Sequence, residues 1–137
     1  CLPLCIISPS SVIIHRSVLD RVGLFDENLP AGEDYDLWLR ITHLFPVLYL
    51  EKKLIVKQAG QWEQLSKNHS LDKYRIMALV KMLEMASLSS EYRTLTLRVL
   101  ENKCRIYQIG CRKHQRTHEV EWVNEIIDHY LKQEPDV

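Results

Sequence analysis

Apolar residues recur along the second half of the chain at steps of three and four, which is the spacing of one face of an α-helix. The pattern predicts three amphipathic helices, the first after Ser70, the second after Ser89 or Ser90, and the third from Thr117. A serine just before such a run is a typical helix N-cap. The second half is therefore predicted to be a helical layer. Its inward-facing residues are Ile76, Leu79, Val80, Leu83 and Ala86 in the first helix, Leu97, Leu100, Cys104, Tyr107 and Cys111 in the second, and Val120, Val123, Ile127 and Tyr130 in the third.

The first half of the chain combines two predicted helices with several short apolar runs. One helix is predicted from Ser17 to near Gly23, and another from Glu33 until Pro46, which cannot continue a helix. The short runs are rich in branched and aromatic side chains, which is typical of β-strands. Together the two halves predict an α+β fold that is mostly helical. The predicted strands cover residues 4–7, 12–14, 47–50 and 54–56.

Composition and charge narrow the class of protein. The 137 residues are 46% hydrophobic and 26% charged, which is ordinary for one soluble globular domain. Lys plus Arg and Asp plus Glu number 18 each, so the chain lacks the basic surface that nucleic-acid binding needs. Four cysteines in two distant pairs favour a reducing, cytoplasmic setting. The start at Cys1, inside an apolar run, leads us to expect a longer protein upstream.

The stretch GLFDENLPAGEDYDLWLRI, residues 23–41, gathers five carboxylates around a Pro-Ala-Gly turn. On a helix that begins after this turn, Asp34 lies one turn before Leu37 and projects over the apolar side. Asp36 and Arg40 are four residues apart, a spacing that predicts a surface ion pair. Asp34 could complement the positive end of the helix dipole, or it could remove a proton from an incoming hydroxyl. Spacing alone leaves both roles open.

The run PSSVIIHRSVLDRVGLFDENLPAGEDYDLWLRI resembles the C-terminal half of the catalytic domain in family 2 glycosyltransferases of the GT-A type. The shared pattern is a Ser-containing strand, a V-G-x-F-D-E turn and an E-D-x-D-L-x-x-R helix. The resemblance covers residues 7 to about 83, and it continues through KQAGQWEQLS and LDKYRIMALVKMLE. Three motifs in the same order make the resemblance specific. It implies a GT-A-type sheet formed by the short strands, followed by a layer of about three helices.

The resemblance also implies an activity, which is the inverting transfer of a sugar from a nucleotide-sugar to an acceptor hydroxyl. The expected setting is bacterial surface glycan synthesis, in the cytoplasm or at the inner face of the membrane, with a glycan or lipid-linked acceptor. The general base of the family's E-D pair falls on Asp34. The expected substrate-binding residues are Glu33, Arg40, Gln61, Trp62 and Gln64.

The family's nucleotide-binding half, with its Asp-x-Asp metal site, has no counterpart among these 137 residues. We therefore expect residues 1–66 to be the acceptor and base side of a catalytic domain, and residues 67–137 to be a helical extension packed on it. A divalent metal, Mg or Mn, would be held by the missing half, and no metal ligand is expected here, since Gln61 stands where the family segment has His. The piece alone is expected to be inactive and to self-associate.

Other interpretations concern the helical half. The runner-up to an enzyme is a non-catalytic protein-interaction module that uses the three C-terminal helices. Cys111, His114 and His118 have a C-x2-H-x3-H spacing that fits zinc, although Cys111 also fits the apolar stripe of a helix. Nearby arginines and lysines form either a solvated face or a patch for anionic lipid headgroups.

Overall fold

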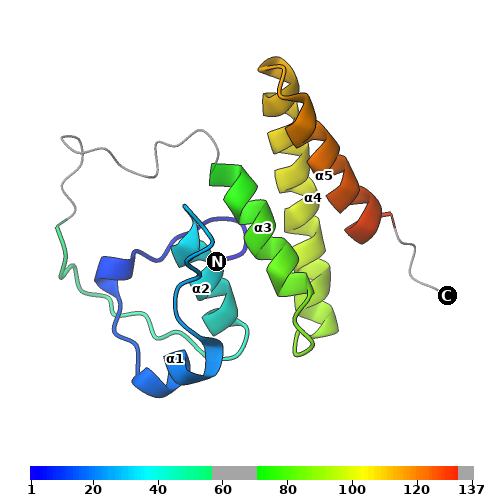
Figure 1. Ribbon diagram of the computed structural model, residues 1–137. Coiled ribbons are helices and arrows are strands. Elements are labelled where there is room, and N and C mark those ends of the chain that lie inside the picture. Colours follow the sequence, from blue (N-terminus) through cyan, green and yellow to red (C-terminus); the bar gives the residue numbers. More distant parts are fainter. Residues whose placement is uncertain (57–70, 133–137) are drawn as a thin grey trace. The chain divides into compact units, whose positions relative to one another are not determined.

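The computed structural model describes residues 1–56 and 71–132, and its regular elements in these ranges are all helical (Figure 1). The chain divides into two compact units, residues 1–74 and residues 75–137. The expected boundary after residue 66 lies outside the described residues and stays a prediction. The elements are the 3₁₀ turn η1 (Pro9–Ser11) and the helices α1 (Arg16–Val22), α2 (Glu33–Thr42), α3 (Leu71–Leu83), α4 (Ser90–Lys113) and α5 (Thr117–Tyr130).

The predicted strands are not present, and the α+β fold with a GT-A-type sheet is wrong for the described residues. Residues 4–7, 12–14, 47–50 and 54–56 follow irregular paths without ladder pairing. A strand is stabilised by hydrogen bonds to a neighbouring strand, and no second strand within the described ranges accepts or donates them. Branched and aromatic composition therefore predicted a conformation that this part of the chain does not adopt.

The predicted helices are found, with ends close to the expected positions. α1 is preceded by His15, whose Nδ1 accepts a hydrogen bond from the Ser17 N–H. It ends at Gly23, which has a φ of +83° and donates its N–H to the Leu19 carbonyl at 2.8 Å. Only glycine adopts such a φ without strain, so this residue stops the helix. The predicted cap of α4 is confirmed, because the Ser89 side chain accepts from the Tyr92 N–H.

The core of the first unit is built around α2. Leu37, Trp38 and Ile41 are buried. The Trp38 indole N–H donates to the Ile7 carbonyl at 2.9 Å, so the N-terminal segment is bound to the helix through its backbone. The burial of apolar area on α2 and the satisfied indole together stabilise this wrapping. The partly buried residues packed against this core are Cys1, Cys5, Ile7, Val12, Ile14, Val18, Leu19, Val22 and Phe45.

The core of the second unit contains buried side chains of α3, of α4 and, in α5, of Val123. The Tyr107 and Trp122 rings meet edge to face, with centroids 6.3 Å apart and planes at 87°. The Gln108 side-chain amide donates to Asn124 Oδ1 at 2.7 Å and joins α4 to α5. α4 has 24 residues, yet neither it nor any other described helix is apolar enough to cross a membrane. The buried side chains of α4 are Thr96, Leu100, Lys103, Cys104, Tyr107 and Cys111.

Burial in the second unit predicts a loss of stability at alkaline pH. Desolvation raises the pKa of the Cys104 thiol from 9.0 to about 11. Burial, followed by the charge of Cys111, raises the pKa of Tyr107 to about 12. The folded chain therefore retains protons that the unfolded chain releases from pH 9 upward, so the unfolded state is favoured as pH rises.

We expect the raised pKa of Cys104 by itself to lower the free energy of unfolding by roughly 2 kcal/mol between about pH 9 and pH 11, since one pKa unit corresponds to about 1.4 kcal/mol. Chemical denaturation followed by circular dichroism at each pH measures this change. Cys104→Ala lowers stability at every pH through a cavity, but its curve should be flatter over this window. An unchanged slope in that variant would assign the alkaline loss to other groups.

The segment of residues 47–56 exposes an unusual amount of apolar surface. Leu48 and Val56 are 95% and 89% exposed, and five further apolar side chains of the segment are exposed as well. Exposed apolar side chains in this number promote association between chains. We expect concentration-dependent self-association, measured by light scattering after size exclusion, and we expect the double variant Leu48→Lys, Val56→Lys to reduce it. Ile13→Lys, at an isolated exposed position, is the matched control and should have no effect.

Candidate functional site

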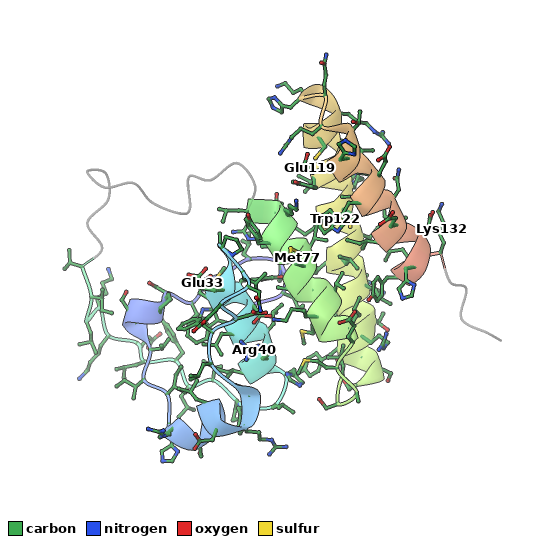
Figure 2. The ribbon with its side chains drawn as sticks, in the orientation of Figure 1. Glu33, Arg40, Met77, Glu119, Trp122 and Lys132 are labelled. Atoms are coloured by element: carbon green, nitrogen blue, oxygen red, sulfur yellow. The ribbon has the colours of Figure 1, made fainter. Side chains whose placement is uncertain are left out.

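The acid-rich stretch is placed at the amino end of α2. Gly32 precedes the helix with a φ of +74°, a left-handed conformation that glycine adopts readily. Its carbonyl accepts the Asp36 N–H at 3.0 Å, which closes the first turn. Figure 2 shows Glu33 at the beginning of α2 and Arg40 farther along the same helix. The three acids of the first turn therefore occupy different directions around one helix end.

Asp36 forms a buried ion pair with Arg40. The Asp36 side chain is 2% exposed and that of Arg40 is 15% exposed. Asp36 Oδ2 lies 3.0 Å from Arg40 Nε and 2.8 Å from Arg40 Nη2, so two nitrogens of the guanidinium face one carboxylate. The ion pair predicted from the spacing is confirmed, but the prediction that it lies at the surface is wrong. The spacing was read correctly, but it does not reveal which residues fold over the pair.

The guanidinium of Arg40 also holds the chain segment that follows α1. Its Nη1 donates to the Val22 carbonyl and its Nη2 donates to the Leu24 carbonyl at 2.8 Å. All three guanidinium nitrogens thus bind protein oxygens, which is the arrangement that a buried guanidinium requires. Arg40 was expected to bind substrate, and that role stays a prediction. In this geometry its guanidinium fixes the turn after α1 against α2.

Glu33 and Asp34 differ from Asp36, because both are partly exposed. Asp34 Oδ1 accepts the Tyr35 N–H at 2.7 Å, and no ion pair in the described part of the chain involves Glu33 or Asp34. The free N–H groups and the positive dipole end of α2 favour negative charge at this place. The site therefore presents one oriented carboxylate and one neighbouring acid to solvent. A carboxylate so placed can accept a proton from a hydroxyl group or a hydrogen bond from it.

The remaining predicted site residues are not tested by this geometry. Gln61, Trp62 and Gln64 lie outside the described residues, and their substrate-binding role stays a prediction. No group of three or more His, Cys, Asp or Glu side chains within the described ranges could hold a metal ion. Cys111 is fully buried in α4, whereas the His118 side chain is 98% exposed, so the zinc spacing does not gather these side chains into a site.

Two features of the site were not anticipated from the sequence. Tyr35 is buried, and its hydroxyl donates to the Leu2 carbonyl, which attaches the start of the chain beside the acid-bearing turn. The Val22 and Leu24 carbonyls complete the shell of Arg40. Backbone carbonyls carry no sequence signature, so no pattern could have identified them. Tyr35 stands between Asp34 and Asp36, but it lies three residues before Trp38 and four before Leu39, a helical spacing that could have indicated its burial.

Comparison with known proteins finds that part of this chain is similar to proteins named as glycosyltransferases. Three curated proteins, each named an uncharacterized glycosyltransferase, are similar to 60 residues of this chain. The identity is 37% in Rickettsia bellii and 34% in both Rickettsia felis and Rickettsia conorii. The match covers 44% of this chain and 9 or 10% of those relatives, so it spans about a tenth of their length. No protein-family model matches the chain, and no solved structure matches it significantly.

The buried ion pair leads to a stability prediction. We expect Asp36→Asn to lower the free energy of unfolding by about 3 kcal/mol, because the amide leaves the Arg40 charge buried without a counter-ion. Denaturant titration measures the change. The matched control is Asp20→Asn in α1, which removes the exposed Arg16–Asp20 pair of the same i, i+4 spacing and should change stability little. Equal effects of the two substitutions would contradict the structural role of the buried pair.

Proposed function

We propose that this chain is the acceptor side of an inverting glycosyltransferase, which transfers a sugar from a nucleotide-sugar to an acceptor hydroxyl. The proposal rests on the observation that the acidic residues of α2 have different environments. The Asp36 carboxylate is buried in its ion pair with Arg40. The Asp34 carboxylate is partly exposed beside Glu33, and the Tyr35 N–H orients it. The names of the Rickettsia relatives support the same class of enzyme. On the same basis we propose a role in bacterial surface glycan synthesis, in the cytoplasm or at the inner face of the membrane.

In the proposed reaction Asp34 is the general base. The Tyr35 N–H holds Oδ1, and Oδ2 has no hydrogen-bond partner among the described residues, so Oδ2 can accept the proton of the acceptor hydroxyl. As that proton leaves, the hydroxyl oxygen forms a bond to the anomeric carbon of the donor sugar. The bond between this carbon and the nucleoside diphosphate breaks, and the diphosphate carries away the electron pair. Attack from the opposite face inverts the configuration.

Glu33 and Arg40 have supporting roles in this proposal. Glu33 can accept a hydrogen bond from a second hydroxyl of a glycan or lipid-linked acceptor, which fixes its orientation. Arg40 keeps the turn after α1 in place, as its bonds to the Val22 and Leu24 carbonyls indicate. Gln61, Trp62 and Gln64 would contact the donor or acceptor from the segment between residues 57 and 70, with Trp62 suited to stacking on a sugar or base.

The donor diphosphate of such enzymes is commonly neutralised by Mg or Mn. The side chains described here do not fit that task, because no three ligating groups among them converge. No step of the proposed reaction is therefore assigned to a metal held by these residues. We propose that a metal site and the nucleotide pocket lie elsewhere in a longer protein.

The second candidate function is a helical protein-interaction module. The observation that favours it is the exposed apolar surface of α4, where Ile106 and Ile109 are 45% and 62% exposed. The two functions are compatible, because the acids belong to the first unit and α4 belongs to the second.

The catalytic proposal is tested in the longest protein encoded around this sequence. The reading frame before Cys1 should encode alternating strands and helices with an Asp-x-Asp motif. In that protein Asp34→Asn should keep its melting temperature and lose about 10²–10⁴-fold in transfer rate, because the amide cannot accept the proton. Glu27→Gln, at an exposed acid of the preceding turn, is the matched control. Near-normal transfer by Asp34→Asn would refute the assignment of the base.

A further inference from the structure

The helix α4 has a second apolar face that the fold does not use. Six positions follow one another at alternating steps of three and four residues, which is the heptad spacing of a helix-to-helix seam. Four of these side chains are exposed, with exposed fractions of 40% for Tyr92, 38% for Leu95, 45% for Ile106 and 62% for Ile109. We call these six residues the outer seam. They are Tyr92, Leu95, Val99, Asn102, Ile106 and Ile109.

The outer seam differs from the side of α4 that packs inside the second unit. Leu100, Cys104 and Tyr107 belong to the inner side and are buried. The inner side is matched by α5, as the Tyr107–Trp122 ring contact illustrates. α4 therefore has two apolar faces, and within the second unit only one of them is buried. A helix with a second apolar face at this spacing is typical of a helix-binding surface.

Positive charge follows one edge of the outer seam. Arg98, Arg105 and Arg112 are exposed and recur every seven residues. Arg105 Nη2 donates to Asn102 Oδ1 at 3.3 Å, so this guanidinium lies against the seam itself. Glu91 occupies the equivalent position at the amino end of the helix, so the positive edge covers its central and carboxyl parts. Acidic side chains on a partner would complement this edge.

Gly110 lies beside the seam, one turn after Ile106. A Cβ placed on Gly110 would have no neighbour within 4 Å among the described residues, so packing inside the chain does not require glycine there. Glycine in a helix interior is destabilising relative to alanine. Its absent side chain leaves room for another helix to approach closely. Gly110 thus gives a steric argument for a helical partner, in addition to the electrostatic argument from the arginines.

A second copy of α4 complements the arginine edge only in part. In a parallel pair the positions opposite Arg98 and Arg105 are the buried Lys103 and Gly110, so no acid faces these arginines. In an antiparallel pair that sets Tyr92 against Ile109, Glu91 faces Arg112, but Arg98 faces Arg105. Like charges at such positions are destabilising. A helix whose apolar seam is flanked by Asp and Glu places an acid opposite each arginine of the edge.

We propose that the outer seam of α4 is the docking surface for an amphipathic helix with acidic flanks from another protein. The apolar residues of that helix pack on Leu95, Ile106 and Ile109, and its acids pair with the arginine edge. The interaction does not depend on the proposed glycosyl transfer, because none of its residues belongs to the acid-bearing turn of α2.

The test uses a synthetic helix of about three heptads, with Leu at the seam and Glu at the flanking positions, and a matched peptide with Lys in place of Glu. The protein is the 137-residue chain carrying Leu48→Lys and Val56→Lys, which limits association through residues 47–56. Titration calorimetry should show the Glu peptide binding at least about 10-fold more tightly than the Lys peptide, with an affinity that falls as salt is added.

Variants locate the binding surface. Ile109→Lys should weaken binding of the Glu peptide by about 10-fold or more without altering the melting temperature, because the side chain is largely exposed. The pair Arg98→Glu, Arg105→Glu should reverse the preference between the two peptides. Ile13→Lys is an exposed apolar control outside α4 and should bind like the parent. Asp34→Asn should also bind normally, which separates this proposal from the catalytic one.

Several results would overturn the proposal. Equal binding of the two peptides would remove the role of charge. Binding to phosphatidylserine vesicles without binding of the Glu peptide would make the surface a lipid-contacting one. A dimer that Ile109→Lys dissociates, again without peptide binding, would make the occupant a second copy of this chain.

Discussion

The buried ion pair between Asp36 and Arg40 is the interaction on which the arrangement around α2 depends. Two charges removed from water are tolerated only when both are fully hydrogen-bonded, and Arg40 meets this condition by binding the Val22 and Leu24 carbonyls as well. The same bonds hold the end of α1 against α2. The buried charge of Arg40 would be destabilising without these partners. With them, it positions the turn that leads to the acid-rich start of α2.

This arrangement assigns different tasks to neighbouring acids. Asp36 is buried by the fold, while Asp34, two residues earlier, remains partly exposed and is oriented by the Tyr35 N–H. The proposed chemistry requires that difference, because a general base must be reachable by substrate and a structural anion must not be. The two side chains point about 200° apart around the helix, since successive residues are about 100° apart.

The second unit follows a different principle. Its core is formed by the buried side chains of α3, the inner side of α4 and Val123 of α5, with the Tyr107–Trp122 contact joining α4 to α5. The outer seam and its arginines contribute little to that core, so these exposed side chains can contact a partner. Gly110 lowers the stability of the 24-residue helix α4, and its missing side chain leaves space for a partner helix on the outer seam.

The sequence by itself determined the helices and several of their ends, because these depend on local causes. The left-handed φ of Gly23 and the Ser89 cap act within one turn, and the spacing of Leu100, Cys104 and Tyr107 marks a buried helix face wherever the helix packs. Only the tertiary structure decided the outcomes that depend on distant residues. The short apolar runs have no neighbouring strand within the described ranges, so their β propensity has no ladder to stabilise. The Asp36–Arg40 spacing is local, but the environment of the pair is not, because the Val22 and Leu24 carbonyls that complete it come from the end of α1 and the turn after it.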